Sequence, residues 1–211
     1  LLDAFDARLP FALTGGQAAV SEEIFADLAG ARPMQRLLQG EVGSGKTLVA
    51  LRAMLAVVDA GGQAVLLAPT EVLAQQHHRT ITTLLGDLGA GRTLGAAEDA
   101  TDVVLITGSL SAIAKRNAML KAASGEAGIV IGTHALLADR IRFAELGLVV
   151  IDEQHRFGVE QRAVLTDRAA ARPHVLVLTA TPIPRSVAMT VFGDLEVSTL
   201  AELPGGRADV Q

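Results

Sequence analysis

The stretch GEVGSGKT, residues 40–47, is the part of the sequence that indicates the fold. It has the G-x-x-x-x-G-K-[ST] spacing of a phosphate-binding loop, and it stands between a short apolar run and a segment with helical spacing. Gly43 and Gly45 let the backbone turn tightly and direct N–H groups at phosphate oxygens, beside a helix N-terminus. Lys46 would reach the terminal phosphates, and the hydroxyl of Thr47 would bind Mg²⁺. The alternative is a chance Gly-rich turn that opens a helix.

Short apolar runs rich in β-branched residues recur along the chain and predict strands that are buried on both faces of a parallel sheet. Segments with helical spacing lie between them. We therefore predict an α/β fold with a mainly parallel sheet and helices on both faces. The six runs are residues 36–38, 64–68, 103–106, 129–131, 148–151 and 175–178.

Two carboxylates, Asp152 and Glu153, follow the fifth apolar run in the sequence DEQH. Open α/β sheets bind ligands at the carboxyl ends of their strands, so both groups are predicted to share the phosphate site. Asp152 would lie on the Mg²⁺ side, and Glu153 would orient or deprotonate an attacking water. This arrangement favours a hydrolase. A solvated acidic strand end and a nucleotide-switched binding module are the alternatives, and a pure switch would not need Glu153.

The composition narrows the class of protein. A chain of 211 residues suits one α/β domain, and 50% hydrophobic residues exclude a disordered chain. The absence of Cys excludes a disulfide framework and favours a reducing compartment. The apolar runs are far shorter than the roughly 20 residues of a membrane-spanning helix, so no membrane association is expected. With a net charge of −5, contact with nucleic acid must be local.

In the order and wording of its motifs, nearly the whole chain resembles the first motor lobe of superfamily 2 helicases, and within them the ATP-dependent branched-DNA helicases. This resemblance implies a RecA-like P-loop lobe over residues 1–200 and a linker over residues 201–211 that leads toward a second lobe. The similar segments are 9–24 (motif Q), 37–47 (motif I), 68–77 (motif Ia), 106–110 and 131–137 (motifs Ib and Ic), 150–162 (motif II) and 178–190 (motif III).

The same resemblance implies ATP and Mg²⁺ as cofactors. Gln17 would recognise the adenine edge, and Phe11 would pack near the base. The implied ATP-binding residues are Phe11, Gln17, Gly43, Ser44, Gly45, Lys46 and Thr47. The catalytic residues are Lys46, Asp152 and Glu153, with Thr47 and Asp152 on Mg²⁺. The residues that couple ATP to DNA are Gln154, His155, Thr179 and Thr181.

Branched or single-stranded DNA is the implied partner. One strand would lie along hydroxyls, backbone N–H groups and helix N-termini, which bind phosphate without a large net charge. The implied DNA-binding residues are Pro69, Thr70, Glu71, Thr107, Gly108, Gly132, Thr133 and His134. The resemblance further implies a second RecA-like lobe that supplies an arginine, a wedge domain of the same full-length protein, and a monomeric enzyme at the bacterial nucleoid in the cytoplasm.

The implied activity is remodelling of stalled replication forks and Holliday junctions in DNA repair and recombination. The alternative is the equivalent lobe of a transcription-repair coupling or primosome-type DNA translocase. The sequence DEQH favours the branched-DNA helicases over a DEEH pattern.

Two further groups have less specific explanations. His77 and His78 are neighbours on a predicted helix and point to different faces, so we predict surface residues and no metal pair. Lys115, Arg116 and Lys121 form a basic cluster that is either a solvated face or a phosphate contact.

Overall fold

The computed structural model describes residues 1–41, 45–89, 100–133, 136, 141–153, 173–180 and 196–200, and at Glu153 it describes the backbone alone. The helices are α1 (Leu2–Arg8), α2 (Gly15–Ala29), α3 (Lys46–Asp59), α4 (Glu71–Leu85), α5 (Ala112–Ser124) and the short 3₁₀ helix η1 (Gly86–Gly89). No helix among the described residues is long and apolar enough to cross a membrane. The predicted linker, residues 201–211, lies outside the described residues.

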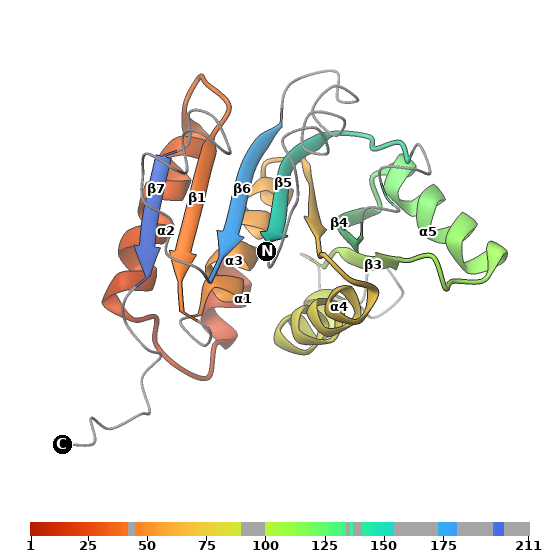
Figure 1. The fold of residues 1–211 in the computed structure, drawn as a ribbon, viewed down its shortest axis with the longest axis horizontal. Coiled ribbons are helices and arrows are strands. Elements are labelled where there is room, and N and C mark those ends of the chain that lie inside the picture. The colour runs from red at the N-terminus through yellow and green to blue at the C-terminus, as the bar shows by residue number, and fades with distance from the viewer. Residues whose placement is uncertain are drawn as a thin grey trace.

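Seven parallel strands form one sheet, in the order β3-β4-β2-β5-β6-β1-β7 (Figure 1). The six predicted runs are confirmed as β1 to β6. β7 was not predicted, because its sequence EVSTL alternates polar and apolar residues at the sheet edge and buries only Ser198 and Leu200. The strands are β1 (Gln35–Gly40), β2 (Gln63–Leu67), β3 (Asp102–Ile106), β4 (Ala127–Gly132), β5 (Leu146–Glu153), β6 (His174–Thr179) and β7 (Glu196–Leu200).

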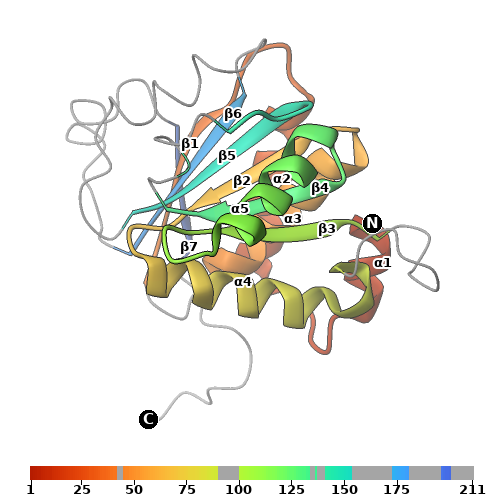
Figure 2. The same ribbon diagram turned by 90° about the vertical axis from the view of Figure 1, so that its right-hand side faces the viewer.

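Helices cover both faces of the sheet, as predicted. Side chains of α1, α2, α3 and α4 pack with one set of strand residues, which includes Leu66 and Val150. Side chains of α5 pack with the opposite set, which includes Val65 and Val149. The two sets alternate along each strand because successive side chains point to opposite faces. Figure 2 shows α4 and α5 on opposite sides of β3.

Local signals in the sequence fix where the helices begin. The Thr14 hydroxyl accepts a hydrogen bond from the Gln17 backbone N–H, and the Gln17 side chain accepts one from the Thr14 N–H, which is a capping box at the start of α2. Thr70 caps α4 through the Leu73 N–H. Gly45, with φ of 87°, opens α3 in a left-handed conformation that favours glycine. The phosphate loop thus ends in a defined helix N-terminus.

Candidate functional site

The strand register brings the predicted nucleotide residues to one edge of the sheet. Gln39 of β1 and Glu153 of β5 both pair with Thr179 of β6, and Gly40 ends β1 one residue later. The carboxyl ends of the three strands therefore lie side by side, with the start of the phosphate loop at one of them. The arrowheads of β1 and β6 point to this edge in Figure 1. The described strand ends of the segments assigned to motifs I, II and III lie together here, although more than a hundred residues of sequence separate the first from the last.

Lys46 is the first residue of α3, and its ammonium group lies close to the end of β1. Its Nζ donates hydrogen bonds to the Gly40 and Glu41 carbonyl oxygens, the latter at 3.4 Å. Burial lowers the pKa of Lys46, and the nearby charge of Asp152 partly offsets this by raising it. A phosphate that replaced the two carbonyls would give the partly desolvated ammonium a full negative charge as its partner.

Gln17 lies against the phosphate loop. Its side chain is only 2% exposed, and a Cβ added at Gly45 would overlap the Gln17 amide nitrogen. Phe11, which precedes the same helix, is 46% exposed. Gln17 therefore lies at the loop, and the ring of Phe11, six positions earlier in the sequence, is exposed to solvent. Adenine recognition by these two residues stays a prediction.

Asp152 forms a hydrogen bond with His77 of α4, with 2.6 Å between Oδ2 and Nε2. The prediction that His77 is a surface residue is wrong, because its side chain is only 15% exposed. The signal that could have placed it is spacing: His77 lies three residues after buried Ala74 and four before buried Ile81, on the flank of the helix that faces the sheet. β2, which leads into α4, neighbours β5, so the two side chains can meet.

The predicted magnesium ligands, Thr47 and Asp152, stand at the start of α3 and near the end of β5. No group of three or more His, Asp or Glu side chains that could hold a metal occurs among the described residues. The hydroxyl of Thr47 and the carboxylate of Asp152 are a donor set that fits Mg²⁺. This ion is commonly held by one or two protein oxygens together with substrate phosphates and waters, rather than by a closed protein cage.

The predicted DNA-binding segments meet along the adjoining stretch of the same edge. Leu67, Gly132 and Ile106 stand in register at the ends of β2, β4 and β3, so the loops that follow them are neighbours. Thr70 and Gly108 are exposed there. Pro69, which directly precedes Thr70, is half-buried. The nucleotide residues on β1, β6 and β5 and the predicted DNA residues on β2, β4 and β3 therefore share one edge.

Glu71, the first residue of α4, connects this helix to the loop after β3. Its Oε1 accepts hydrogen bonds from the Ser109 hydroxyl and, at 3.1 Å, from the Ser109 N–H. The Ser109 hydroxyl, followed by Thr107 and the Ser109 N–H, holds the pKa of Glu71 below its usual value. Because an ionised carboxylate repels phosphate, Glu71 is not suited to bind DNA phosphate directly. Its contact with Ser109 instead holds the loop after β3. Ser109, which sequence reasoning did not single out, is exposed at this loop.

Three other predicted DNA-binding residues are buried at this edge of the sheet. Thr107 and Thr133 are buried, and so is Gly132. A Cβ added at Gly132 would come within 2.5 Å of the Ile106 carbonyl oxygen and 2.6 Å of Leu136 Cδ1, so glycine is needed there for close packing. The hydroxyl groups of Thr107 and Thr133 are thus not presented to a ligand.

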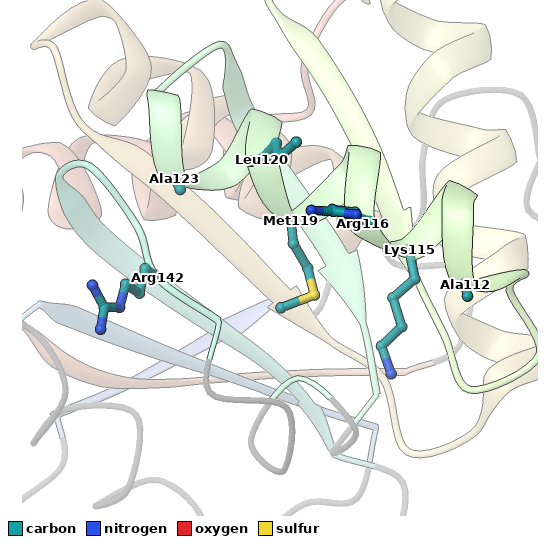
Figure 3. A pocket seen from close by; sticks show the side chains of 7 residues that line it. All are labelled: Ala112, Lys115, Arg116, Met119, Leu120, Ala123 and Arg142. Carbon is teal, nitrogen blue, oxygen red and sulfur yellow. The ribbon is translucent and has the colours of Figure 1, made fainter.

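The three basic residues of α5, Lys115, Arg116 and Lys121, have different surroundings. Lys121 pairs with Asp102 at 3.1 Å. Lys115 and Arg116 instead line a cavity of about 460 Å³ together with Met119, Leu120 and Arg142. Figure 3 shows Lys115 and Met119 extending from the same side of α5, with Arg142 across from them. The cavity combines apolar and basic side chains and lies apart from the nucleotide residues.

Several predicted site residues lie outside the described residues. They are Gly43, Ser44, His134, Gln154, His155 and Thr181. Thr179, in contrast, is buried at the carboxyl end of β6.

Comparison with known proteins adds the family. Residues 15–190 match the family model described as DEAD/DEAH box helicase. The chain belongs to the DEAD/DEAH box helicase family. This helicase domain is 60% identical over 205 residues to the ATP-dependent DNA helicase RecG of Mycobacterium leprae, and 47% identical over 207 residues to RecG of Streptococcus pneumoniae. These alignments cover 96% and 98% of the chain, but only 28% and 29% of the relatives.

A solved structure of RecG bound to a three-way DNA junction has the same fold. It superposes on 99% of the helicase domain with a TM-score of 0.79 and 39% sequence identity, and the matched part is 26% of that chain. The RecA-like fold and the predicted resemblance to branched-DNA helicases are thereby confirmed. Membership of this family also implies the use of a nucleotide.

Proposed function

We propose that the chain is the ATP-binding and hydrolysing motor lobe of a helicase that acts on branched DNA, with roles at stalled replication forks and Holliday junctions. The observation that carries the proposal is the shared edge of the sheet. There the strand ends that carry Gly40, Asp152 and Glu153 lie beside the ends of β2, β4 and β3. The similarity to RecG, including a structure with a three-way DNA junction, supports branched DNA as the partner.

In this proposal Lys46 exchanges its contacts with the Gly40 and Glu41 carbonyls for the terminal phosphates of ATP. Thr47 and Asp152 hold Mg²⁺, which would neutralise charge on the phosphates when bound. Glu153 orients the attacking water or accepts its proton. Hydroxyls and backbone N–H groups around Thr70 and Gly108 bind DNA phosphates.

Turnover is proposed to need segments beyond these 211 residues. The chain spans 28% of its Mycobacterium leprae relative. Motors of this class close two lobes around the nucleotide, and an arginine from the opposite lobe can contribute about 10³ to 10⁵ in rate. The proposed partners are therefore DNA, a second lobe and a wedge domain of one monomeric protein in the cytoplasm.

The test is ATP hydrolysis measured as phosphate release, with and without a three-way DNA junction, beside a Lys46→Ala variant. Because the sequence has no Trp or Tyr, intrinsic fluorescence would report little. We expect near-background turnover from the 211 residues alone and DNA-stimulated, Lys46-dependent turnover from a full-length protein that carries them. Full-length protein that hydrolyses no ATP would contradict the proposal. Strong DNA-stimulated turnover by the chain alone would contradict the need for a second lobe.

A further inference from the structure

The contact between His77 and Asp152 joins two elements with different predicted tasks. Their side chains are 15% and 17% exposed, and 2.6 Å separates Nε2 from Oδ2. A carboxylate oxygen accepts hydrogen bonds and an imidazole N–H can donate one, so this contact can orient the Asp152 carboxylate. A short, largely desolvated bond of this kind fixes the orientation of a carboxylate more firmly than an exposed one.

Asp152 has a hydrogen-bond partner in His77 and a nearby positive charge in Lys46. Lys46 is close enough to Asp152 for their charges to interact, and it comes from the helix that follows the phosphate loop. His77 comes from α4, which follows the neighbouring strand β2. The bond from His77 engages Oδ2, and a carboxylate has a second oxygen with which it can bind a cation.

The N-terminus of α4 lies at the proposed DNA surface. Thr70 caps the helix, and Glu71 in its first turn holds the loop of Ser109. Seven residues separate Thr70 from His77, which is about 10 Å along a helix axis. A single rigid helix therefore reaches from the proposed DNA contacts to the acidic residue of the nucleotide site.

We propose that His77 is a positioning residue that holds the Asp152 carboxylate and thereby links the DNA-facing helix α4 to the nucleotide site. This inference rests on the proposed function. It assigns to motif Ia a contact inside the nucleotide site in addition to its implied place on DNA. A movement of α4 when DNA binds then changes the orientation of Asp152, and by reciprocity bound nucleotide changes the affinity for DNA.

The experiment compares four variants in a full-length protein that carries this chain. His77→Leu removes the donor at similar volume, and His77→Gln restores an N–H donor close to the position of Nε2. His77→Asn keeps a polar side chain that is too short to reach, and it carries the test if the leucine variant does not fold. His78→Leu is the matched control, because His78 is the adjacent half-buried histidine on the same helix.

The first readout is binding, not turnover. Affinity for a fluorescent, non-hydrolysable ATP analogue is measured in Mg²⁺ and in EDTA. We expect the gain in affinity that Mg²⁺ provides to fall about 10- to 100-fold in His77→Leu, the usual effect of losing a hydrogen-bond partner of a metal ligand. Affinity in EDTA should stay unchanged, since a misfolded site would lose both. His77→Gln should recover part of the gain, and His78→Leu should match the parent.

The second readout is coupling. The factor by which a three-way DNA junction changes the affinity for the analogue should approach one in His77→Leu and stay near the parent value in His78→Leu. If the leucine variant keeps both the Mg²⁺ gain and the coupling factor, the inference is overturned while the proposed function stands. If the parent shows no nucleotide binding that depends on Lys46, the proposed function fails and the inference fails with it.

Discussion

The side-chain amide of Gln17 lies against Gly45, so the residue predicted to recognise adenine contacts the loop predicted to hold phosphate. The capping box with Thr14 fixes Gln17 in place before any nucleotide arrives. A residue of the predicted base site and a residue of the predicted phosphate site therefore pack together, and a side chain added at Gly45 should displace Gln17.

Replacing Gly45 with alanine tests this unit. Both Gly45 and Gly61 have positive φ, 87° and 90°, but a Cβ at Gly61 meets nothing within 4 Å. Gly61→Ala should lower the free energy of unfolding by about 1–2 kcal/mol through backbone strain alone. Gly45→Ala should cost about 1–3 kcal/mol more, because the methyl group displaces the Gln17 amide. Urea denaturation measures both, and equal costs would show that the Gln17 contact is not tight.

Replacing Lys46 with methionine should abolish nucleotide binding and stabilise the nucleotide-free chain near neutral pH. Burial lowers the pKa of Lys46 in the folded state below the ordinary 10.5, so carrying the charge disfavours the folded state at any pH below that lowered pKa. The disadvantage disappears as pH rises through the lowered pKa toward 10.5.

Thermal unfolding of the Lys46→Met variant and the parent between pH 7 and pH 10.5 measures this difference. The methionine variant should melt higher at pH 7, and the two curves should converge in alkali. A difference that stayed constant or grew with pH would contradict the assignment of the shift to Lys46.

Replacing Glu71 with alanine should loosen the loop of Ser109. The pKa of Glu71 is lowered in the folded state, chiefly by the Ser109 hydroxyl. Its stabilising effect is therefore fully present above the ordinary value of 4.5 and is lost as pH falls through the lowered pKa. Glu71→Ala should melt below the parent at neutral pH and match it in strong acid. Exposed Glu22 on α2 supplies the control variant, because Glu22→Ala removes a surface carboxylate that lies outside this loop.

Gly108 and Gly132 should respond oppositely to alanine. A Cβ at Gly108 meets nothing within 4 Å, so Gly108→Ala should keep the stability of the parent but weaken DNA binding several-fold by crowding the proposed phosphate path. Gly132→Ala should instead cost about 1–3 kcal/mol of stability, because its methyl group would press on a backbone carbonyl. Urea melts and fluorescence anisotropy with a labelled DNA junction separate the two effects. Tight DNA binding by Gly108→Ala would remove this residue from the proposed interface.

The sequence was most informative where a pattern is local. The phosphate loop, the runs of β1 to β6 and the residues at strand ends follow from spacing and apolar composition within a few residues. Contacts that depend on which strands become neighbours could not be found this way. His77 meets Asp152 because β2 lies next to β5, and β7 escaped notice because an edge strand needs few apolar residues.

The sequence also could not predict which residues of these loops are exposed and which are buried. Thr107 and Thr133 resemble DNA-contacting hydroxyls in sequence, yet both side chains are buried. Glu71 stands in the segment assigned to DNA, but its carboxylate is engaged with Ser109. Spacing locates a loop along the chain, whereas the packing of neighbouring loops decides which atoms a ligand can reach.

The position of β1 between β6 and β7 determines when the nucleotide site can be assembled as the chain is synthesised. Of the described strands, β1 is synthesised first, yet its neighbours β6 and β7 are synthesised last, and the Met34 N–H donates a hydrogen bond to His174, 140 residues later. Closing so long a loop is slow, and nascent chains emerge at about 5–20 residues per second. The phosphate loop therefore waits roughly 7 to 28 seconds for β6, and a ribosome that stalls before β6 leaves a chain with no completed nucleotide site.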